Sequence, residues 1–234
     1  MSQRNGRCVR FDRKVSQSDR VAEGLSIFSR DIFVEGSVAL QSLTIFFIFL
    51  YLQQKDDDIK VTCPMETDFW RGTLHGFIKD DAPFYWTTAD NDFEARLTIK
   101  GKFKVLYDQA GLMLRIDEEN WIKLGICYYR DQLYVSCCFT RGQSDWSTHR
   151  LPKTKIENFY VWAKRTAEVI DCYYSLDNEN WIRIRQGYFS DKPRVRVGMM
   201  CAAPESAGFK VTFSDFMIKD TNEDGGNSDG SVSD

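Results

Sequence analysis

Two basic residues near the middle of the chain, Arg115 and Lys123, are the first candidates for binding a ligand. Hydrophobic and polar residues alternate around each of them, which is the pattern of half-buried β-strands. Pairing Ile116 with Ile122 aligns the apolar residues of the two strands, and the two basic residues then fall directly opposite each other. Like charges at this spacing need a neutralising group, which an anionic or hydroxyl-rich ligand would supply. A carboxylate on a neighbouring strand, such as Glu94, or simple exposure to water is the favoured explanation.

The two cations belong to a predicted meander of three antiparallel strands between Val105 and Thr140. One face of the meander is apolar and includes Leu112, Leu114 and Ile116. The opposite face carries Gln109, Met113, Arg115, Lys123, Tyr134 and Ser136. This second face is the candidate binding surface, because its polar groups are not needed in the core.

The acidic residues of the chain do not form a pattern that predicts hydrolysis. Glycoside hydrolysis requires two carboxylates about 5 to 9.5 Å apart on either side of the sugar. Asp117, Glu118 and Glu119 are adjacent in a predicted turn, so their side chains point in different directions. No E-x-D-x-E run, which would align carboxylates along one strand, occurs in the sequence. A glycoside hydrolase is therefore the least favoured function.

Other catalytic and metal-binding arrangements give equally weak signals. A Ser/His/Asp site would have to use His75 or His149, the two histidines of the chain. Residues 144–149 hold Ser, Asp and His together, but a loop rich in capping residues explains that composition better. Cys127 and Cys138 share a face without further ligands that suit a metal. We therefore predict no catalytic residues, no metal site and no cofactor, and favour a non-catalytic protein over an enzyme.

Composition and charge favour an intracellular globular protein. The 234 residues suffice for one domain with extensions, and the net charge of −3 gives no general affinity for nucleic acids. The 7 cysteines are scattered and include no C-x-x-C pair, which argues against a disulfide framework or a zinc ribbon. We expect a reducing environment and a cytoplasmic location.

Short alternating segments separated by turn residues predict at least nine strands and no long helix, the pattern of an all-β sandwich. The sandwich domain is expected to span residues 56–219. It follows an N-terminal extension over residues 1–55 and precedes a disordered acidic tail over residues 220–234. Within the domain, Thr67–Trp86 is expected to be loop and short strand near one sheet edge, and Arg141–Pro152 is expected to be a loop.

The most apolar run of the chain, Leu43–Leu52, has three interpretations. Extended back to residue 38, it is still shorter than the ~20 residues that a bilayer span needs. A buried strand or helix packed on the sandwich is the favoured interpretation, followed by a segment that is not native to the domain. A membrane anchor through residues 38–52 ranks last, although basic residues before the run and acidic residues after it would suit one.

Five stretches of the chain together resemble a known family. They are TDFWRGTLHGFIKDDAPFYW, LYDQAGLMLRIDEENWIKLGI, SDWS, YSLDNENW and VGMMCAAPESAGFKVTFSDF. In their order and spacing they are similar to the family of the yeast regulation-of-enolase protein. The resemblance covers roughly residues 59–218 and implies a concanavalin A-like lectin/glucanase jelly roll of two antiparallel sheets. It does not extend to residues 1–55, where the family would place an edge strand just before Ile59.

The resemblance also implies a concave face where ligands bind. The residues that would line this face are Gln109, Met113, Arg115, Trp121, Lys123, Tyr134 and Ser136. The residues that would offer stacking surfaces at its rim are Trp70, Trp86 and Trp146. Because the family's function is largely unknown, two hypotheses follow from fold-level analogy. One is a non-catalytic module that binds a carbohydrate-like or small anionic ligand, and the other is a cytosolic regulatory factor that binds a protein partner.

Overall fold

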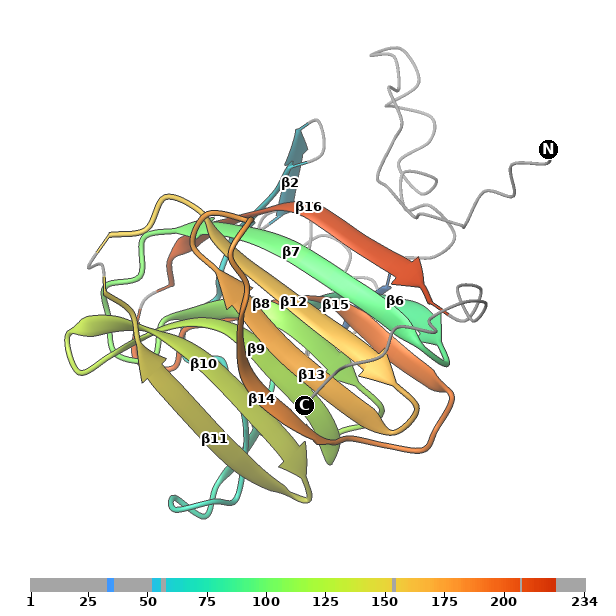
Figure 1. The fold of residues 1–234 in the computed structure, drawn as a ribbon. Coiled ribbons are helices and arrows are strands. Elements are labelled where there is room, and N and C mark those ends of the chain that lie inside the picture. Colours follow the sequence, from blue (N-terminus) through green and yellow to red (C-terminus); the bar gives the residue numbers. More distant parts are fainter. Residues whose placement is uncertain (1–32, 36–51, 56–57, 153–154, 207, 222–234) are drawn as a thin grey trace, which may run out of the picture.

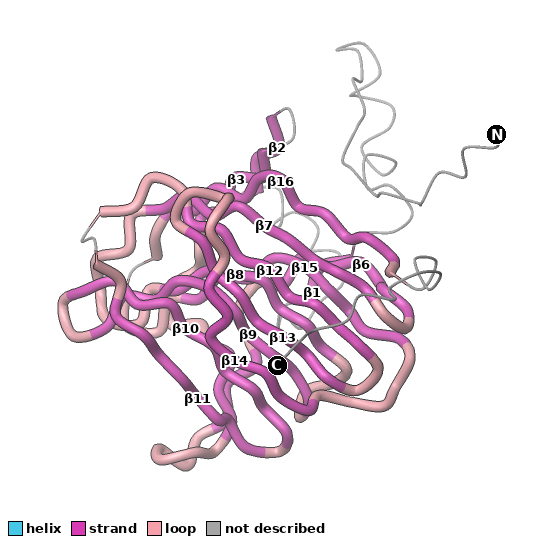
Figure 2. The backbone as a smooth tube through the Cα atoms, viewed as in Figure 1, coloured by secondary structure: helices cyan, strands magenta, loops and turns pink. Residues whose placement is uncertain are grey.

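The computed structural model describes residues 33–35, 52–55, 58–152, 155–206 and 208–221. Within these residues the chain consists of strands, turns and loops, and it forms no helix (Figure 2). Two antiparallel sheets of seven strands each pack together as a sandwich (Figure 1). The predicted all-β jelly-roll sandwich of the concanavalin A-like type is therefore confirmed.

The described part of the chain contains sixteen strands. In chain order they are β1 (Phe33–Glu35), β2 (Leu52–Lys55), β3 (Asp58–Thr62), β4 (Phe69–Arg71), β5 (Ile78–Asp80), β6 (Phe84–Asp90), β7 (Phe93–Gly101), β8 (Gln109–Arg115), β9 (Asn120–Tyr129), β10 (Gln132–Arg141), β11 (Gln143–Arg150), β12 (Phe159–Thr166), β13 (Val169–Ser175), β14 (Ile182–Tyr188), β15 (Arg194–Ala202) and β16 (Lys210–Asp220). One sheet, which we call the concave sheet, has the order β1-β6-β15-β8-β9-β10-β11. The second sheet has the order β14-β13-β12-β7-β16-β3-β2, and β4 and β5 form a separate hairpin.

The inward faces of the two sheets form one large apolar core. Alternate residues of each strand point into it, among them Leu97 and Ile99 from the second sheet and Leu112 and Leu114 from the concave sheet. Each of these four side chains is at most 2% exposed. Burial of such a side chain contributes about 1.5–3 kcal/mol, so the alternation that predicted the strands is also what holds the sheets together.

The interior strand β15 joins parts of the concave sheet that are far apart in sequence. Its residue Val197 pairs with Thr87 of β6 on one side and with Leu114 of β8 on the other. The sheet therefore depends on a strand near the C-terminal end of the domain for the continuity of its middle.

The predicted meander is confirmed as β8, β9 and β10, but the predicted register of its first hairpin is wrong by two residues. Leu114 pairs with Ile122, and Arg115 lies opposite Trp121 instead of Lys123. The loop is shorter than expected because the main-chain N–H of Ile116 donates to the Asn120 carbonyl and closes the turn early. A shift of two residues keeps every side chain on its face, so the two faces were predicted correctly although the pairing was not.

The segment Arg141–Pro152, predicted as a loop, is largely a strand. Residues Gln143–Arg150 form β11, which pairs along its length with β10 and lies at the edge of the concave sheet. Gly142, with φ of 72°, makes the tight turn between the two strands. Seven of the eight β11 side chains are exposed or only partly buried, so the alternation of apolar and polar residues that identifies a half-buried strand is missing.

The segment Thr67–Trp86 also differs from its predicted position near a sheet edge. Its strands β4 and β5 pair only with each other, and the hairpin they form lies over the outward surface of the concave sheet. Phe69 and Ala82 are buried against this sheet, at 3% and 0% exposure. Strand β6 then enters the interior of the concave sheet between β1 and β15.

The apolar run Leu43–Leu52 lies almost wholly outside the described residues. Of this run the structure describes Leu52, where β2 begins, and β2 pairs with β3 as an edge strand of the second sheet. The alternatives proposed for residues 38–51 and the disorder predicted for the terminal segments likewise lie outside the described residues. In the part of the chain that is described, no helix has the length and apolar character needed to cross a bilayer.

Candidate ligand site on the concave sheet

The candidate site lies on the surface of the concave sheet that points away from the core, which we call the concave face. Alternation along β8 places Gln109, Gly111, Met113 and Arg115 on this face, while Leu112 and Leu114 point into the core. The same rule applied to β9 and β10 adds the remaining predicted residues. These are Trp121, Lys123, Tyr134 and Ser136.

Arg115 is bound by the chain's own hairpin. Its Nη1 and Nη2 atoms donate to Oδ1 and Oδ2 of Asp80 in β5, both at 2.6 Å, in a bidentate ion pair. Arg115 is 6% exposed, so this carboxylate replaces most of its water. The neutralising group that the sequence required is therefore a carboxylate, but it is not Glu94, which lies in the second sheet beside Arg96.

The concave face does contain a pair of like charges, but the residue opposite Arg115 in this pair is Arg196 and not Lys123. These two residues lie opposite each other on β8 and β15. The guanidinium of Arg196 stacks 5.2 Å from the ring of Trp86 and donates to the Ile116 carbonyl. Burial lowers the pKa of Arg196 from its usual value. The bidentate Asp80 carboxylate makes this close approach of two arginines tolerable.

Lys123 is also occupied from within the chain. Its Nζ donates to Asp68 Oδ1 at 3.2 Å, to the Phe69 carbonyl at 2.5 Å and to Gln109 Oε1 at 3.0 Å. An ammonium has three donors, and all three are used. Gln109 in turn donates from Nε2 to the same Asp68 oxygen at 3.0 Å. Neither cation of the predicted site is available to an anionic ligand unless the hairpin moves.

The hairpin also seals a small apolar cluster against the concave face. Phe69 lies 6.2 Å from the ring of Trp121, and both pack with Met113 and Cys138. Met113 and Trp121 are 0% and 1% exposed, so neither presents a surface to solvent in this conformation. We call this part of the concave face, with Arg115 and Lys123, the covered half.

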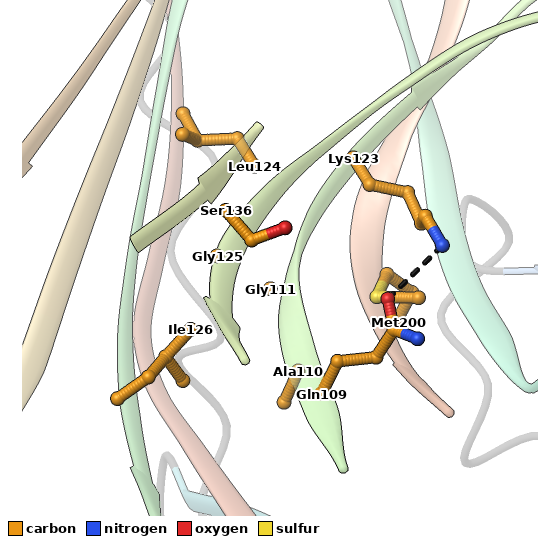
Figure 3. A pocket seen from close by; sticks show the side chains of 9 residues that line it. All are labelled: Gln109, Ala110, Gly111, Lys123, Leu124, Gly125, Ile126, Ser136 and Met200. Carbon is orange, nitrogen blue, oxygen red and sulfur yellow. Dashed lines mark hydrogen bonds between the residues drawn. The ribbon is translucent and has the colours of Figure 1, made fainter. Parts of the chain in front are cut away.

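Beside the hairpin the concave face opens into a shallow hollow, shown in Figure 3. Gly111 and Gly125 lie opposite each other on its floor, and Ser136 continues the row on β10. Above the glycines, the Lys123 ammonium donates a hydrogen bond to the side-chain amide oxygen of Gln109 (Figure 3). The hollow measures about 190 Å³ out to open solvent but encloses only about 10 Å³, room for one water. It is a platform more than a pocket.

The two floor positions are occupied by glycine for a steric reason. A Cβ atom on Gly125 would lie 2.0 Å from the main-chain oxygen of Ala110, and one on Gly111 would lie 2.3 Å from that of Leu124. Both distances are far below van der Waals contact, so strands β8 and β9 approach as closely as they do because neither position carries a side chain. The same absence leaves the floor of the hollow bare.

Four partly buried aromatic residues, Tyr107, Tyr129, Tyr134 and Trp146, form a connected group that we call the aromatic wall. Trp146 lies 5.2 Å from Tyr129 and 6.2 Å from Tyr107, and Tyr129 lies 5.6 Å from Tyr134. The Trp146 indole N–H donates to Ser136 Oγ at 2.8 Å, which ties the wall to the floor of the hollow. Burial, followed by the neighbouring Tyr129, raises the pKa of Tyr107, so this phenol remains neutral at physiological pH.

The structure brings some of the predicted rim residues together and separates others. Trp70 of the hairpin meets Trp146 edge-on at 6.2 Å and so continues the aromatic wall. Trp86 lies on β6, with four strands of the sheet between it and β11, and stacks on Phe84. Sequence reasoning missed Tyr107 and Tyr129, although a tyrosine just before the first strand of the meander and another at the turn before its third strand were signals that could have found them.

The described residues give no support to the catalytic arrangements weighed above. No group of three or more metal-ligating side chains occurs among them. In β11, Asp145 and Ser147 both bind the guanidinium of Arg185, whereas His149 is exposed two residues further on. The Ser/Asp/His stretch is thus part of an edge strand, and Arg185 of β14 links this strand to the second sheet.

These features define an all-β sandwich whose concave face is half covered by its own hairpin. A family model described as "Protein of unknown function (DUF1349)" matches residues 51–221. The chain belongs to this family. "Regulation of enolase protein 1" of Saccharomyces cerevisiae is 36% identical to it over 155 residues, which are 65% of this chain and 77% of the yeast protein. The resemblance found in the sequence motifs is therefore confirmed.

Solved structures show the same fold. The crystal structure of a functionally unknown protein from Saccharomyces cerevisiae superposes with a TM-score of 0.71 at 28% identity, covering 80% of this chain and 95% of that one. A Bacteroides ovatus protein, "Xyloglucan PUL GH43B", superposes with a TM-score of 0.65 at 14% identity, covering 94% of this chain and 40% of that one. At 14% identity the second likeness shows the fold alone.

Proposed function

We propose that the chain is a non-catalytic binding protein whose concave face takes a neutral, hydroxyl-rich, carbohydrate-like ligand. The observation that carries this proposal is the aromatic wall beside a floor of glycines. Aromatic side chains that remain partly exposed offer apolar surface to the apolar face of a sugar ring, and the bare floor lets such a ring approach the sheet. Gln109, Lys123 and Ser136 supply polar groups at the edge of the platform.

A neutral ligand is favoured over an anionic one by the state of the two cations. Arg115 and Lys123 are at most 7% exposed and already hold the carboxylates of Asp80 and Asp68. An anion would have to displace a carboxylate that is tethered beside its cation, which gives the internal partner a high effective concentration. Hydroxyl groups, in contrast, can add to the free lone pairs of Gln109 and Ser136 without breaking an ion pair.

A non-catalytic role is supported by the chemistry of the hollow. Its lining offers an amide, an ammonium and a hydroxyl group, but no carboxylate. The nearby Asp68 carboxylate already accepts hydrogen bonds from Lys123 and Gln109, so it is engaged as a structural acceptor. We also propose a cytoplasmic location, supported by six free, buried cysteine thiols in the described part of the chain.

The test is a thermal-shift screen of the full chain against neutral oligosaccharides built from glucose, xylose and mannose. A ligand at 100 times its Kd adds about 2.7 kcal/mol to the stability, which is readily detected. The wild type is compared with Trp146→Ala, which removes the centre of the aromatic wall. Trp86→Ala is the matched control, because four strands of the sheet separate that indole from Trp146. A shift that is absent from Trp146→Ala but present in Trp86→Ala supports the proposal, and no shift with any sugar refutes it.

A second candidate function, regulation of enolase through protein contact, is favoured by the 36% identity to a relative named for that role. The test is titration of purified enolase with the purified chain while enolase turnover and complex formation are measured. Binding that persists in Trp146→Ala would assign the partner to a surface other than the hollow. Unchanged turnover together with the absence of a complex would refute this second candidate.

A further inference from the structure

Asp68, which directly precedes β4, is a carboxylate that uses only one of its two oxygens within the chain. Its Oδ1 accepts three hydrogen bonds, from the Phe69 main-chain N–H at 2.7 Å, from Gln109 Nε2 at 3.0 Å and from Lys123 Nζ at 3.2 Å. Within the described part of the chain, no donor reaches Oδ2. The Asp68 side chain is 14% exposed, and its second oxygen is open to solvent.

The orientation of this carboxylate is fixed before any ligand arrives. Three donors converge on Oδ1, and the Asp68 main-chain N–H donates to Asp81 Oδ1 at 2.9 Å. A group that is already ordered loses little conformational entropy when it binds. The free oxygen is therefore presented in a defined direction.

Asp68 lies at the edge of the hollow. Two of the residues that donate to it, Gln109 and Lys123, line the hollow. Burial, which is the largest cause, and the negative charge of Asp68, which is a smaller one, both raise the pKa of Tyr107 in the aromatic wall. The carboxylate is thus close to both the polar edge of the hollow and its aromatic wall.

Two hydrogen-bond donors of the hollow are also unused. The Gln109 amide nitrogen has two protons, and one of them is donated to Asp68. The Ser136 hydroxyl accepts from Trp146, but its own proton has no acceptor among the residues that the structure describes. Ser136 is 8% exposed and its hydroxyl group points toward the hollow (Figure 3). The hollow and its edge therefore offer one fixed acceptor and two donors.

We propose that Asp68 is the specificity-determining residue of the hollow, where its Oδ2 accepts a hydroxyl proton from a neutral sugar and disfavours sugar acids. This inference rests on the carbohydrate-binding function proposed above. A sugar hydroxyl both donates and accepts, so one hydroxyl can donate to Oδ2 while its neighbour on the ring accepts from Gln109 or Ser136. Hydrogen bonds to an ionised acceptor are the stronger kind, so this contact would contribute much of the selectivity.

Charge gives the reason why a sugar acid is disfavoured. A carboxylate of the ligand has no proton to donate to Oδ2 and carries the same charge, and such juxtaposition suppresses binding of the wrong partner. Lys123 offers no compensation, because its three donors are already used. The same ammonium balances the charge of Asp68 from 3.2 Å, which favours a neutral ligand over a cationic one.

Isothermal titration calorimetry of the full chain with matched sugars tests the proposal. The neutral probes are cellohexaose, xylohexaose and mannohexaose. Their acidic counterparts are the glucuronate hexamer for the first two and the mannuronate hexamer for the third. Asp68→Asn keeps an oxygen for the three donors but replaces the free acceptor by an NH2 group. Asp90→Asn is the matched control, because it removes the same charge from an exposed ion pair with Arg194.

We expect the wild type to bind a neutral hexamer at least about tenfold more tightly than its uronate counterpart. In Asp68→Asn the neutral hexamer should bind at least about tenfold more weakly, and the ratio of the two Kd values should fall toward one. Asp90→Asn should behave like the wild type. Both Kd values of a ratio come from the same variant, so a loss of stability in Asp68→Asn would affect them alike and leave the ratio unchanged.

The outcomes separate this inference from the function on which it rests. Neutral binding that is lost in Trp146→Ala but shows an unchanged ratio in Asp68→Asn would overturn the role of Asp68 and leave the proposed function standing. Tighter binding of a uronate than of its neutral counterpart by the wild type would overturn the discrimination against sugar acids. If none of the three neutral hexamers binds, the proposed function is refuted and this inference with it.

Discussion

The two halves of the concave face are built by the same strands but present opposite surfaces. In the covered half, charged side chains are buried under the hairpin, and each is matched by a carboxylate of the same chain. In the open half, glycines form the floor and partly exposed aromatic residues form the wall. The boundary runs through Lys123, whose ammonium is held by the hairpin and whose hydrogen bond to Gln109 borders the hollow.

This contrast teaches that residue type alone does not identify a binding surface. Arg115 and Lys123 have the chemistry of an anion site, yet the chain satisfies both from within. Tyr107 and Tyr129 carry no charge, yet they form part of the surface that remains accessible. The accessible surface is decided by where a segment distant in sequence folds back, which is here the hairpin at residues 69–80.

Removal of the carboxylate that holds Arg115 is expected to have the largest effect. Asp80→Ala takes away both bonds of the bidentate pair and leaves a guanidinium that is 6% exposed without its main counter-charge. Breaking a buried pair in this way costs about 3 kcal/mol. Urea unfolding measures the loss. Asp90→Ala is the matched control, because the ion pair of Asp90 with Arg194 is exposed to solvent on both sides and contributes little to stability. An equal loss in the free energy of unfolding in the two variants would show that the buried ion pair of the covered half contributes no more than an exposed one.

In the open half, the floor is expected to be the most sensitive part. Gly125→Ala introduces a Cβ atom 2.0 Å from the Ala110 carbonyl oxygen, so the strands must separate. Overpacking of this kind costs about 2 kcal/mol, measured by urea unfolding. In Gly187→Ala the nearest atom is instead in the Phe139 ring, at 3.0 Å, and a side chain yields more easily than a backbone. A loss in Gly125→Ala no greater than that in Gly187→Ala would show that the close strand approach is not required.

The hydrogen bond between wall and floor is expected to contribute less. Ser136→Ala removes the acceptor of the Trp146 indole N–H and is expected to cost about 1 kcal/mol. The same variant frees the indole, so tryptophan fluorescence should shift to longer wavelength. Thr148→Ala, at the exposed position opposite Ser136 on β11, is the control and should change neither quantity. Identical spectra for wild type and Ser136→Ala would show that the wall is positioned by ring contacts alone.

The smallest expected effect concerns Cys127, which lies beside Gln109 and Tyr134 in the row of residues next to the hollow. Burial raises the pKa of this thiol to about 12, against about 9 in the unfolded chain. The folded protein therefore binds the proton more tightly, and this contribution to stability is lost as the pH rises from about 9 to about 12. Alkylation of Cys127 at pH 9, followed by mass spectrometry, should be slow in the folded chain and fast in urea. Fast alkylation in the absence of urea would mean that the Cys127 thiol is accessible to solvent in the folded chain.

The sequence was sufficient to predict the sandwich and the faces of the central strands, because alternation is imposed by the core and appears directly in residues such as Leu112 and Leu114. It was not sufficient for the register of the β8–β9 hairpin, since a shift of two residues leaves the same apolar pattern. Strand β11 was missed because an exposed edge strand has no apolar face to reveal it. Most of the predicted site residues do share the concave face.

The cover over half of that face could not have been predicted from the sequence. It depends on contacts between residues far apart in the chain, such as Asp80 with Arg115 and Asp68 with Lys123. Neither contact leaves a periodic signal in the sequence. The motif containing Phe69 and Trp70 indicated the family, but not that the segment lies across the sheet.

The position of β15 in the middle of the concave sheet has a consequence for synthesis of the protein. Its partners β6 and β8 leave the ribosome long before residues 194–202 are made. Until then each of them has an open edge, and unpaired strand edges are templates for wrong pairing and aggregation. Pairing over such sequence separations is also slow. The nascent chain must therefore stay unaggregated until its last strands emerge.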